Sequence, residues 1–157
     1  MSSPLGKRTA RPLPAVSGVV FDPGGRLLLV RRGKPPRLGE WSLPGGAVEP
    51  GETDETALRR EILEECHIQV KMEFFIAESR LEEDEGCGGR FFRYRIKTYC
   101  CSSPYQEAQA GSDAESVLWA DAASLESLGL AREFLVLSQK ALRMRQRNRV
   151  ASPRGRI

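Results

Sequence analysis

The sequence has little of what marks secreted, membrane or zinc-binding proteins. Its 157 residues include four cysteines and one histidine, and the cysteines form neither a Cys-x-x-Cys pair nor a zinc-ligand spacing. We therefore expect free thiols in a reducing compartment. No apolar run is long enough to span a membrane, and residues 1–14 lack the apolar core of a signal peptide. These absences predict a cytoplasmic protein without a membrane partner.

The length and the ordinary composition, with 40% hydrophobic and 29% charged residues, predict one globular domain. We place this domain at residues 15–142, between a flexible lead at 1–14 and a basic tail at 143–157. The tail carries six arginines and no acidic residue, so contact with a nucleic acid or an acidic partner is one interpretation. Because no aromatic residues are interleaved, we prefer a solubilising end and expect no nucleic-acid partner.

Residues 53–66 have the pattern of an amphipathic helix. Thr53 or Asp54 can cap its start, and residues 56–66 contain no glycine or proline. The apolar stripe of the helix consists of Leu58, Ile62 and Cys66. We expect this stripe to face a core, which leaves the polar residues of the helix on another side.

Three glutamates, Glu61, Glu64 and Glu65, fall on one arc of the predicted helix. Like charges at these spacings destabilise a helix, so a compensating partner is expected. A hard divalent cation such as Mg²⁺ or Mn²⁺ takes oxygen ligands and would offset the repulsion. The alternative is a solvated acidic face that Arg59 and Arg60 partly neutralise.

A wider set of residues resembles the Nudix box, Gly-x5-Glu-x7-Arg-Glu-U-x-Glu-Glu-x-Gly-U, in which U is a bulky aliphatic residue. The matching residues are Gly46, Glu52, Arg60, Glu61, Ile62, Glu64, Glu65 and Ile68. One position departs, since His67 stands where the family has glycine. That glycine follows the helix, where the chain commonly needs a positive φ, and histidine adopts this conformation at some cost. We interpret His67 as a C-terminal cap.

The resemblance implies a hydrolase that cleaves the diphosphate linkage of a nucleoside diphosphate derivative, with Mg²⁺ or Mn²⁺ as cofactor. The metal ligands that it implies are Glu61, Glu64, Glu65 and the backbone of Gly46. The catalytic residues that it implies are Glu64, Arg60 and Glu52, with Glu52 holding Arg60 and the helix in place. The general base stays open between Glu64 and two residues of later segments, Glu107 and Glu115.

The partner is expected to be a small-molecule nucleotide substrate. Residues 31–46, which end in Trp-Ser-Leu-Pro-Gly-Gly, resemble bacterial members grouped with ADP-ribose pyrophosphatases, so ADP-ribose or a similar derivative is the first choice. A proline found in some ADP-ribose enzymes is replaced here by Glu83. The alternatives are a MutT-like hydrolase of ordinary or oxidised nucleoside triphosphates, and a regulatory domain that binds nucleotides without hydrolysis. Candidate substrate-binding residues are Arg31, Arg32 and Trp41, and the resemblance allows a homodimer.

The predicted elements follow the order β-β-β-α-β-β-β-α-α. Strands are expected at residues 15–21 and 26–32, joined as a hairpin, and at 47–48, 68–78, 91–101 and 115–120; helices are expected at 53–66, 121–128 and 131–146. These elements predict an α+β fold, an α/β/α sandwich with a mixed sheet between helices, which the resemblance also implies. One strand face should carry Val70, Met72, Phe74 and Ile76.

Overall fold

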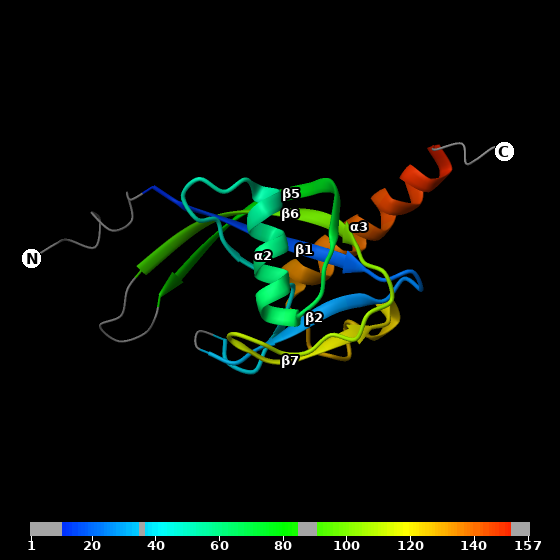
Figure 1. The fold of residues 1–157 in the computed structure, drawn as a ribbon, viewed down its shortest axis with the longest axis horizontal. Helices are drawn as coiled ribbons and strands as arrows, with labels where there is room; N and C mark the ends of the chain where they lie inside the picture. The colour runs from blue at the N-terminus through cyan, green and yellow to red at the C-terminus, as the bar shows by residue number, and fades with distance from the viewer. Residues whose placement is uncertain (1–10, 35–36, 85–90, 152–157) are drawn as a thin grey trace, which may run out of the picture.

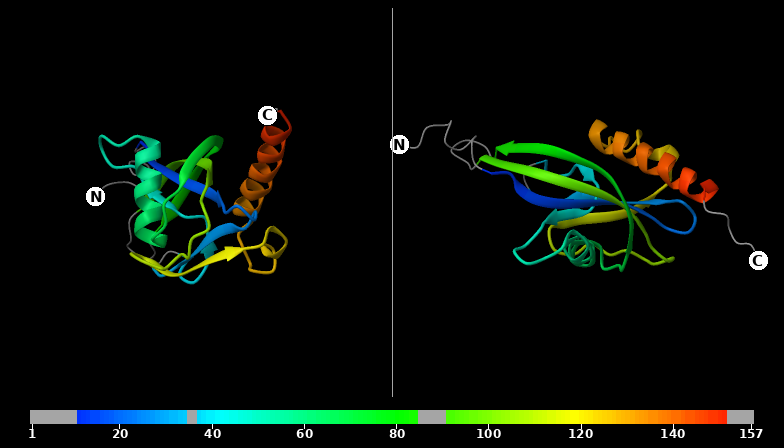
Figure 2. Two further views of the ribbon diagram at one scale, coloured as in Figure 1. Left: turned by 45° about the vertical axis from the view of Figure 1, so that its right-hand side comes forward. Right: turned by 90° about the horizontal axis from the view of Figure 1, so that it is seen from above.

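The computed structural model describes residues 11–34, 37–84 and 91–151. Its strands are β1 (Leu13–Phe21), β2 (Leu27–Arg32), β3 (Trp41–Ser42), β4 (Gly45–Ala47), β5 (Lys71–Asp84), β6 (Phe91–Ser102) and β7 (Ala114–Ala120). Its helices are α2 (Asp54–Cys66), the short 3-10 helix η1 (Ala122–Ser124) and α3 (Arg132–Ala151). The strands form one mixed sheet, with α2 over one face and α3 over the other (Figure 1, Figure 2). The predicted α+β sandwich is confirmed.

The sheet is arranged around β1. This strand pairs in parallel with β6 along its whole length, from Leu13 opposite Tyr94 to Phe21 opposite Ser102, and it pairs antiparallel with β4. Its pairing with β2 is limited to Phe21 and Leu27 beside the turn, and β2 continues by pairing with β3 and β7. The predicted hairpin therefore exists only at its turn, because each of its strands has other partners beyond it.

The two faces of the sheet bury separate clusters of apolar side chains. Alternate residues of a strand point to opposite faces, so Val16 and Val20 of β1 pack with α2, whereas Val19 and Phe21 pack with α3. In β6, Cys101 belongs to the cluster on the α2 side, and the adjacent Cys100 belongs to the cluster on the α3 side. The central strand is thus covered on both sides, and its position is fixed between the two helices.

β5 departs from the predicted one-faced pattern. Register shifts occur between Met72 and Phe74 and between Phe75 and Ala77. Such a bulge adds an unpaired residue and reverses the facing of the residues that follow. Met72 therefore packs on the α2 side, whereas Phe74 and Ile76 pack on the α3 side. The prediction that these side chains share one face was wrong.

The other differences concern the ends of elements. The strand predicted at 47–48 lies at Gly45–Ala47, and β3 was not predicted. The helix predicted at 121–128 is reduced to η1, while α3 runs to Ala151 and includes residues that we assigned to the basic tail. Arginine is a good helix former, which is consistent with this extension. Within the described ranges, no helix is long and apolar enough to cross a membrane.

Candidate active site

α2 begins and packs as the sequence predicts. Thr53 has extended backbone angles, φ −81° and ψ 164°, and its Oγ1 accepts a 3.1 Å hydrogen bond from the N–H of Thr56. Asp54 and Glu55 follow in the first turn, where negative charge is favoured. The buried residues of the helix are Ala57, Leu58, Ile62 and Cys66. This burial places the polar residues of α2 beside β4 and the turn that follows it.

Arg60 is the centre of a hydrogen-bonded network on α2. Its Nε and Nη2 donate to the two carboxylate oxygens of Glu52, at 2.8 Å each, and Nη2 also donates to the carbonyl of Ala47 at 3.0 Å. Nη1 donates to Glu61 Oε1 at 2.8 Å. The hydrogen bonds from Arg60 lower the pKa of Glu52 to about 2. The expected pair of Glu52 and Arg60 is therefore present, and it ties the helix to β4.

Two glycines of β4 allow the carboxylates of α2 to approach the backbone closely. A Cβ atom at Gly46 would lie 2.6 Å from both carboxylate oxygens of Glu61, and one at Gly45 would overlap the carbonyl oxygen of Val16. The N–H of Gly45 donates a 2.9 Å hydrogen bond to Glu65 Oε1. A side chain at either glycine would push these groups apart, so the Gly-Gly pair is required by packing.

Glu65 is a partly buried acid of the site. Its burial raises the pKa to about 7, an effect that the Gly45 hydrogen bond opposes and that the charge of Glu61 increases. Weaker contributions come from Arg32, which lowers the pKa, and from Asp113, which raises it. Burial also raises the pKa of Glu61, against the hydrogen bond from Arg60. The site therefore holds two carboxyl groups whose ionised forms are poorly solvated.

The chemistry of these acids fits a divalent cation, because a hard cation would stabilise carboxylates that burial destabilises. Glu64 is more exposed, and its Oε2 lies 3.5 Å from Arg60 Nη1. In the described conformation Glu61 turns to Arg60 and Glu65 turns to Gly45. Among the residues that the structure describes, no three acidic, histidine or cysteine side chains converge on one point. The expected ligands thus share one region of the molecule without forming a closed cage.

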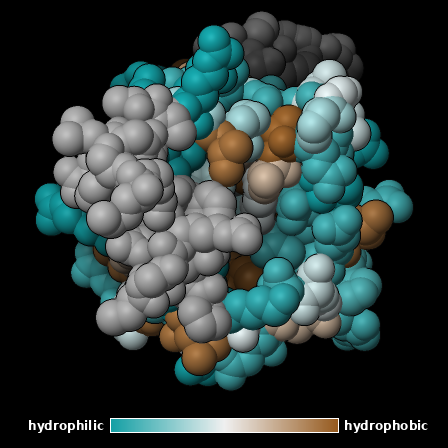
Figure 3. All heavy atoms as spheres, turned by 90° about the vertical axis from the view of Figure 1, so that its left-hand side faces the viewer, coloured by the Kyte–Doolittle hydropathy of each residue, from teal (hydrophilic) through white to brown (hydrophobic). Residues whose placement is uncertain are grey.

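A cavity of about 750 Å³ adjoins this region. Its walls come from β1, β5 and β6, from the first turns of α3 and from residues in the 32–47 segment. Figure 3 shows the molecule from the side of the β5–β6 hairpin, where apolar residues lie in a hollow that hydrophilic residues border above and on the right. Gly45 and Gly46 border the cavity and also contact Glu65 and Glu61. The cavity and the carboxylates are therefore separated by little more than strand β4.

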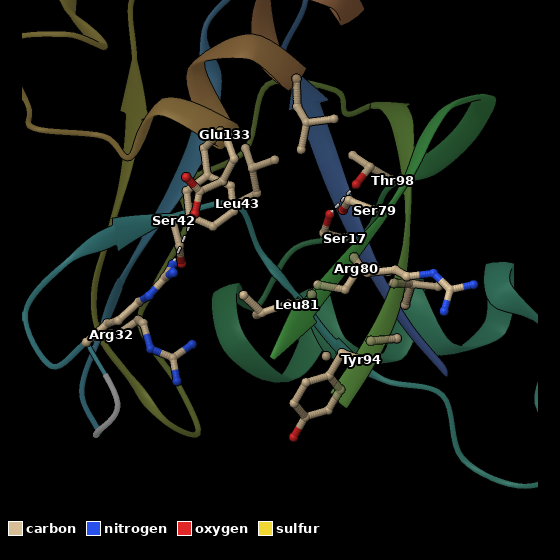
Figure 4. A pocket seen from close by; sticks show the side chains of 18 of the residues that line it. Ser17, Arg32, Ser42, Leu43, Ser79, Arg80, Leu81, Tyr94, Thr98 and Glu133 are labelled. Carbon is tan, nitrogen blue, oxygen red and sulfur yellow. Dashed lines mark hydrogen bonds and ion pairs between the residues drawn. The ribbon is translucent and has the colours of Figure 1, made fainter. Parts of the chain in front are cut away.

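The cavity has polar groups on two sides (Figure 4). On one side Ser17 Oγ and Thr98 Oγ1 form a 2.8 Å hydrogen bond, and Tyr94 lies further toward the start of β6, beyond Arg80 and Leu81 of β5 in the view. Arg32 lies on the opposite side. Arg37 also lines the cavity, and its Nη1 lies 3.3 Å from Glu133 Oε1 at the start of α3. A ligand would meet hydroxyl groups and Arg80 on one side and Arg32 on the other.

The remaining predicted residues are distributed unevenly around the cavity. Arg32 lines it, but Arg31 and Trp41 are not among its lining residues in the described part of the chain. Arg31 Nε donates to the carbonyl of Gly39 at 3.0 Å and lies 3.8 Å from Glu115 Oε2. Trp41 packs against the apolar cluster on the α3 side. These contacts give Arg31 and Trp41 structural partners outside the cavity.

The two later candidates for a general base are exposed. Glu115 lies on β7 and has Arg31 as its ion-pair partner, while Glu107 lies on the loop before β7. Neither has a hydrogen bond to the described carboxylates of α2. The choice among Glu64, Glu107 and Glu115 therefore stays a prediction.

Sequence reasoning missed the hydroxyl groups that line the cavity. Ser17 is a polar residue in the buried part of β1, and Thr98 is fully buried in β6. Both positions face the α3 side, where the neighbouring inward residues are apolar. The sequence did contain a signal for this pair: each hydroxyl residue stands at an inward position among apolar residues. A buried hydroxyl needs a hydrogen-bond partner, so such positions predict a polar contact.

Comparison with known proteins places the chain in a family. The family described as NUDIX domain matches residues 11–140, which is most of the sequence. The chain belongs to the Nudix family. A solved NUDIX-family hydrolase from Clostridium perfringens superposes with a TM-score of 0.69 at 16% identity, covering 86% of this chain and 99% of that one. The resemblance inferred from the box is therefore confirmed, and the fold is the Nudix fold.

Two curated relatives illustrate the range of the family. A MutT-like protein of Streptomyces ambofaciens is 45% identical over 75 residues, which are 46% of this chain and 46% of that protein. Nucleoside triphosphatase NudI of Enterobacter sp. (strain 638) is 30% identical over 120 residues, which are 66% of this chain and 78% of that protein. The match thus spans less than half of the MutT-like protein.

Proposed function

We propose that this Nudix protein is a metal-dependent hydrolase that cleaves a diphosphate linkage in a nucleotide. The observation that carries the proposal is the position of the cavity. Gly45 and Gly46 separate a pocket of small-molecule size from the partly buried carboxylates Glu61 and Glu65. A bound nucleotide can therefore place its organic part in the cavity and its phosphates at the acidic region, where they need a cation because carboxylates repel them.

Glu61, Glu64 and Glu65 would hold Mg²⁺ or Mn²⁺, with the backbone of Gly46 as a further oxygen donor. Such an ion neutralises phosphate charge and activates water. Glu52 holds the Arg60 guanidinium through two 2.8 Å hydrogen bonds, and Arg60 in turn orients Glu61. Removal of partners that orient metal ligands typically lowers activity or metal affinity about 10- to 100-fold. Arg32 lines the cavity and would bind phosphate from that side.

We propose a nucleoside triphosphate as the substrate. The name of one relative, nucleoside triphosphatase NudI, supports this choice over the ADP-ribose first expected from the sequence. ADP-ribose is the second candidate, because the cavity has polar groups on opposite sides that suit a ligand with two polar ends. Both substrates have a diphosphate bond for the same site to cleave.

The three buried cysteines support the expected reducing compartment. Cys66, Cys100 and Cys101 are unpaired, and burial raises the pKa of Cys66 and Cys101 while it raises that of Cys100 to about 11. Thiols that stay protonated react slowly, so these cysteines are structural. We infer a cytoplasmic location.

The test is product release from a substrate panel in Mg²⁺ or Mn²⁺, with EDTA as the control. The panel contains the nucleoside triphosphates, 8-oxo-dGTP and ADP-ribose. Formation of a nucleoside monophosphate and pyrophosphate identifies a triphosphate substrate, whereas AMP and ribose 5-phosphate identify ADP-ribose. Tight nucleotide binding with no cleavage in either metal would contradict the proposal and favour a regulatory domain.

A further inference from the structure

The loop between β6 and β7, residues 103–113, is attached to the end of α2 by polar contacts. Gln106 fixes one part of this loop: its Nε2 donates to the carbonyl of Gln69 at 2.9 Å, and its Oε1 accepts from the N–H of Gln69 at 3.3 Å. The N–H of Gln109 donates to the carbonyl of Cys66, and that of Gly111 donates to the carbonyl of Glu65, at 2.9 Å each. The loop therefore supplies partners to the terminal carbonyls of the helix.

His67 forms a side-chain contact with the same loop. Its backbone has φ 58° and ψ 33°, the left-handed conformation in which the Nudix box has glycine. Its Nδ1 lies 2.9 Å from the carbonyl oxygen of Gln109. Because a carbonyl can only accept, Nδ1 must carry the proton in this hydrogen bond. A glycine at this position would satisfy the backbone better but would not make the bond.

Gly111 fits closely against His67 and the helix end. A Cβ atom at Gly111 would lie 2.5 Å from the carbonyl oxygen of Glu64 and 3.1 Å from His67 Nδ1, and it would overlap His67 Cε1. The imidazole ring therefore covers the loop backbone in addition to donating a hydrogen bond. Two separate contacts, one polar and one of shape, join His67 to the loop.

The far end of the loop reaches the end of β2. Asp113 pairs with Lys34 through a 2.7 Å contact, and its carbonyl accepts from the N–H of Gly33 at 2.9 Å. The loop thus bridges the C-terminal end of α2 and the end of β2.

We propose that His67 is a positioning residue that anchors the β6–β7 loop to the C-terminal end of the catalytic helix and thereby holds the last turn that carries Glu65, whose carbonyl accepts from the N–H of Gly111. The anchoring contact depends on the histidine that replaces the box glycine. The hydrogen bond and packing of its side chain offset the conformational cost of a positive φ at a non-glycine residue. The effect on catalysis rests on the proposed function. The attachment of the loop does not depend on the proposed function, so the experiment can refute the attachment and the proposed function independently.

The test compares His67→Gly with His67→Asn in the full chain. Glycine keeps the left-handed backbone and removes the side chain. Asparagine tolerates that backbone and carries an N–H donor at the same number of bonds from Cα as Nδ1. Hydrogen exchange followed by NMR reports the Gln109 and Gly111 amides, and the buried amide of Ile62 in α2 reports the integrity of the fold.

We expect His67→Gly to speed exchange of the Gln109 and Gly111 amides at least about tenfold, with Ile62 unchanged. The kcat should fall about three- to tenfold with little change in KM, and His67→Asn should restore both values. Unchanged exchange of the loop amides in His67→Gly would overturn the anchor. Faster exchange with an unchanged kcat would overturn the positioning role, and a wild-type protein without turnover would overturn the proposed function while the exchange result still decides the anchor.

Discussion

Arg60 and Arg95 both lie beside glutamates, and their surroundings differ. Arg60 makes two 2.8 Å hydrogen bonds to Glu52, and the side chain of Glu52 is 14% exposed. Arg95 Nε lies 4.0 Å from Glu78 Oε1, with side chains that are 48% and 39% exposed. The first arrangement is bidentate and restricted in geometry, whereas the second is solvated. The arginine–glutamate network of Arg60 therefore orients carboxylates beside α2, whereas the Arg95–Glu78 pair is an exposed ion pair on the surface of the β5–β6 hairpin.

The largest effect is expected from Glu65→Gln. The amide keeps the shape of the side chain and an oxygen that can accept from the N–H of Gly45, but it removes the charge that a cation needs. We expect kcat to fall at least about a thousandfold, about 4 kcal/mol of transition-state stabilisation, with little loss of structure. Steady-state kinetics and circular dichroism measure the two quantities. Wild-type turnover in this variant would refute the assignment of Glu65.

The next effect concerns the pH dependence of stability without divalent metal. Burial raises the pKa of Glu65 from an ordinary value of 4.5 to about 7, so the folded state binds the proton more tightly than the unfolded state does. The resulting contribution to stability is full below pH 4.5 and is lost as the pH rises through 7. The loss should reach about 3 kcal/mol at pH 8.

Denaturant unfolding of the wild type and of Glu65→Gln between pH 4 and 8 measures this loss, because the variant cannot titrate at this position. The difference between the two free energies of unfolding should change by about 3 kcal/mol, and Mg²⁺ should reduce the change at pH 8. Parallel curves for the two proteins would show that Glu65 is not buried in the way described.

Arg60→Ala should have an intermediate effect. The substitution removes both hydrogen bonds to Glu52 and the one that orients Glu61, so kcat should fall about 10- to 100-fold. Arg59→Ala is the matched control, because Arg59 is the adjacent arginine of α2 and is exposed. Comparing the kinetics of the two variants separates the effect of losing the Arg60 hydrogen bonds from the effect of losing one positive charge on α2. Equal losses in the two variants would contradict the comparison.

The smallest effect should come from Arg95→Ala. Exposed ion pairs contribute about 0 to 1 kcal/mol, and the 4.0 Å pair with Glu78 belongs to this class. We expect a change of less than about 0.5 kcal/mol in the free energy of unfolding and unchanged turnover. Thermal unfolding and the kinetic assay provide the measurements. A large loss of activity would mean that the hairpin cations serve the site after all.

The local parts of this site were predictable from the sequence, and the long-range parts were not. Helix capping at Thr53 and the apolar stripe of α2 follow from neighbouring residues. The β5 bulges are decided by pairing with β6, so the separation of Met72 from Phe74 could not be read from alternation. Likewise, Ser17 and Thr98 are 81 positions apart and meet only because β1 and β6 pair in parallel.

The central claim is that α2 carries a cation site, and Mn²⁺ binding tests it most directly. The free Mn²⁺ signal in electron paramagnetic resonance measures the bound fraction for the wild type, Glu65→Gln and the control Arg59→Ala. We predict that the wild type and the control bind Mn²⁺ equally and reversibly with EDTA. Glu65→Gln should bind at least about tenfold more weakly. Equal binding by all three proteins, or no binding by the wild type, would contradict the account.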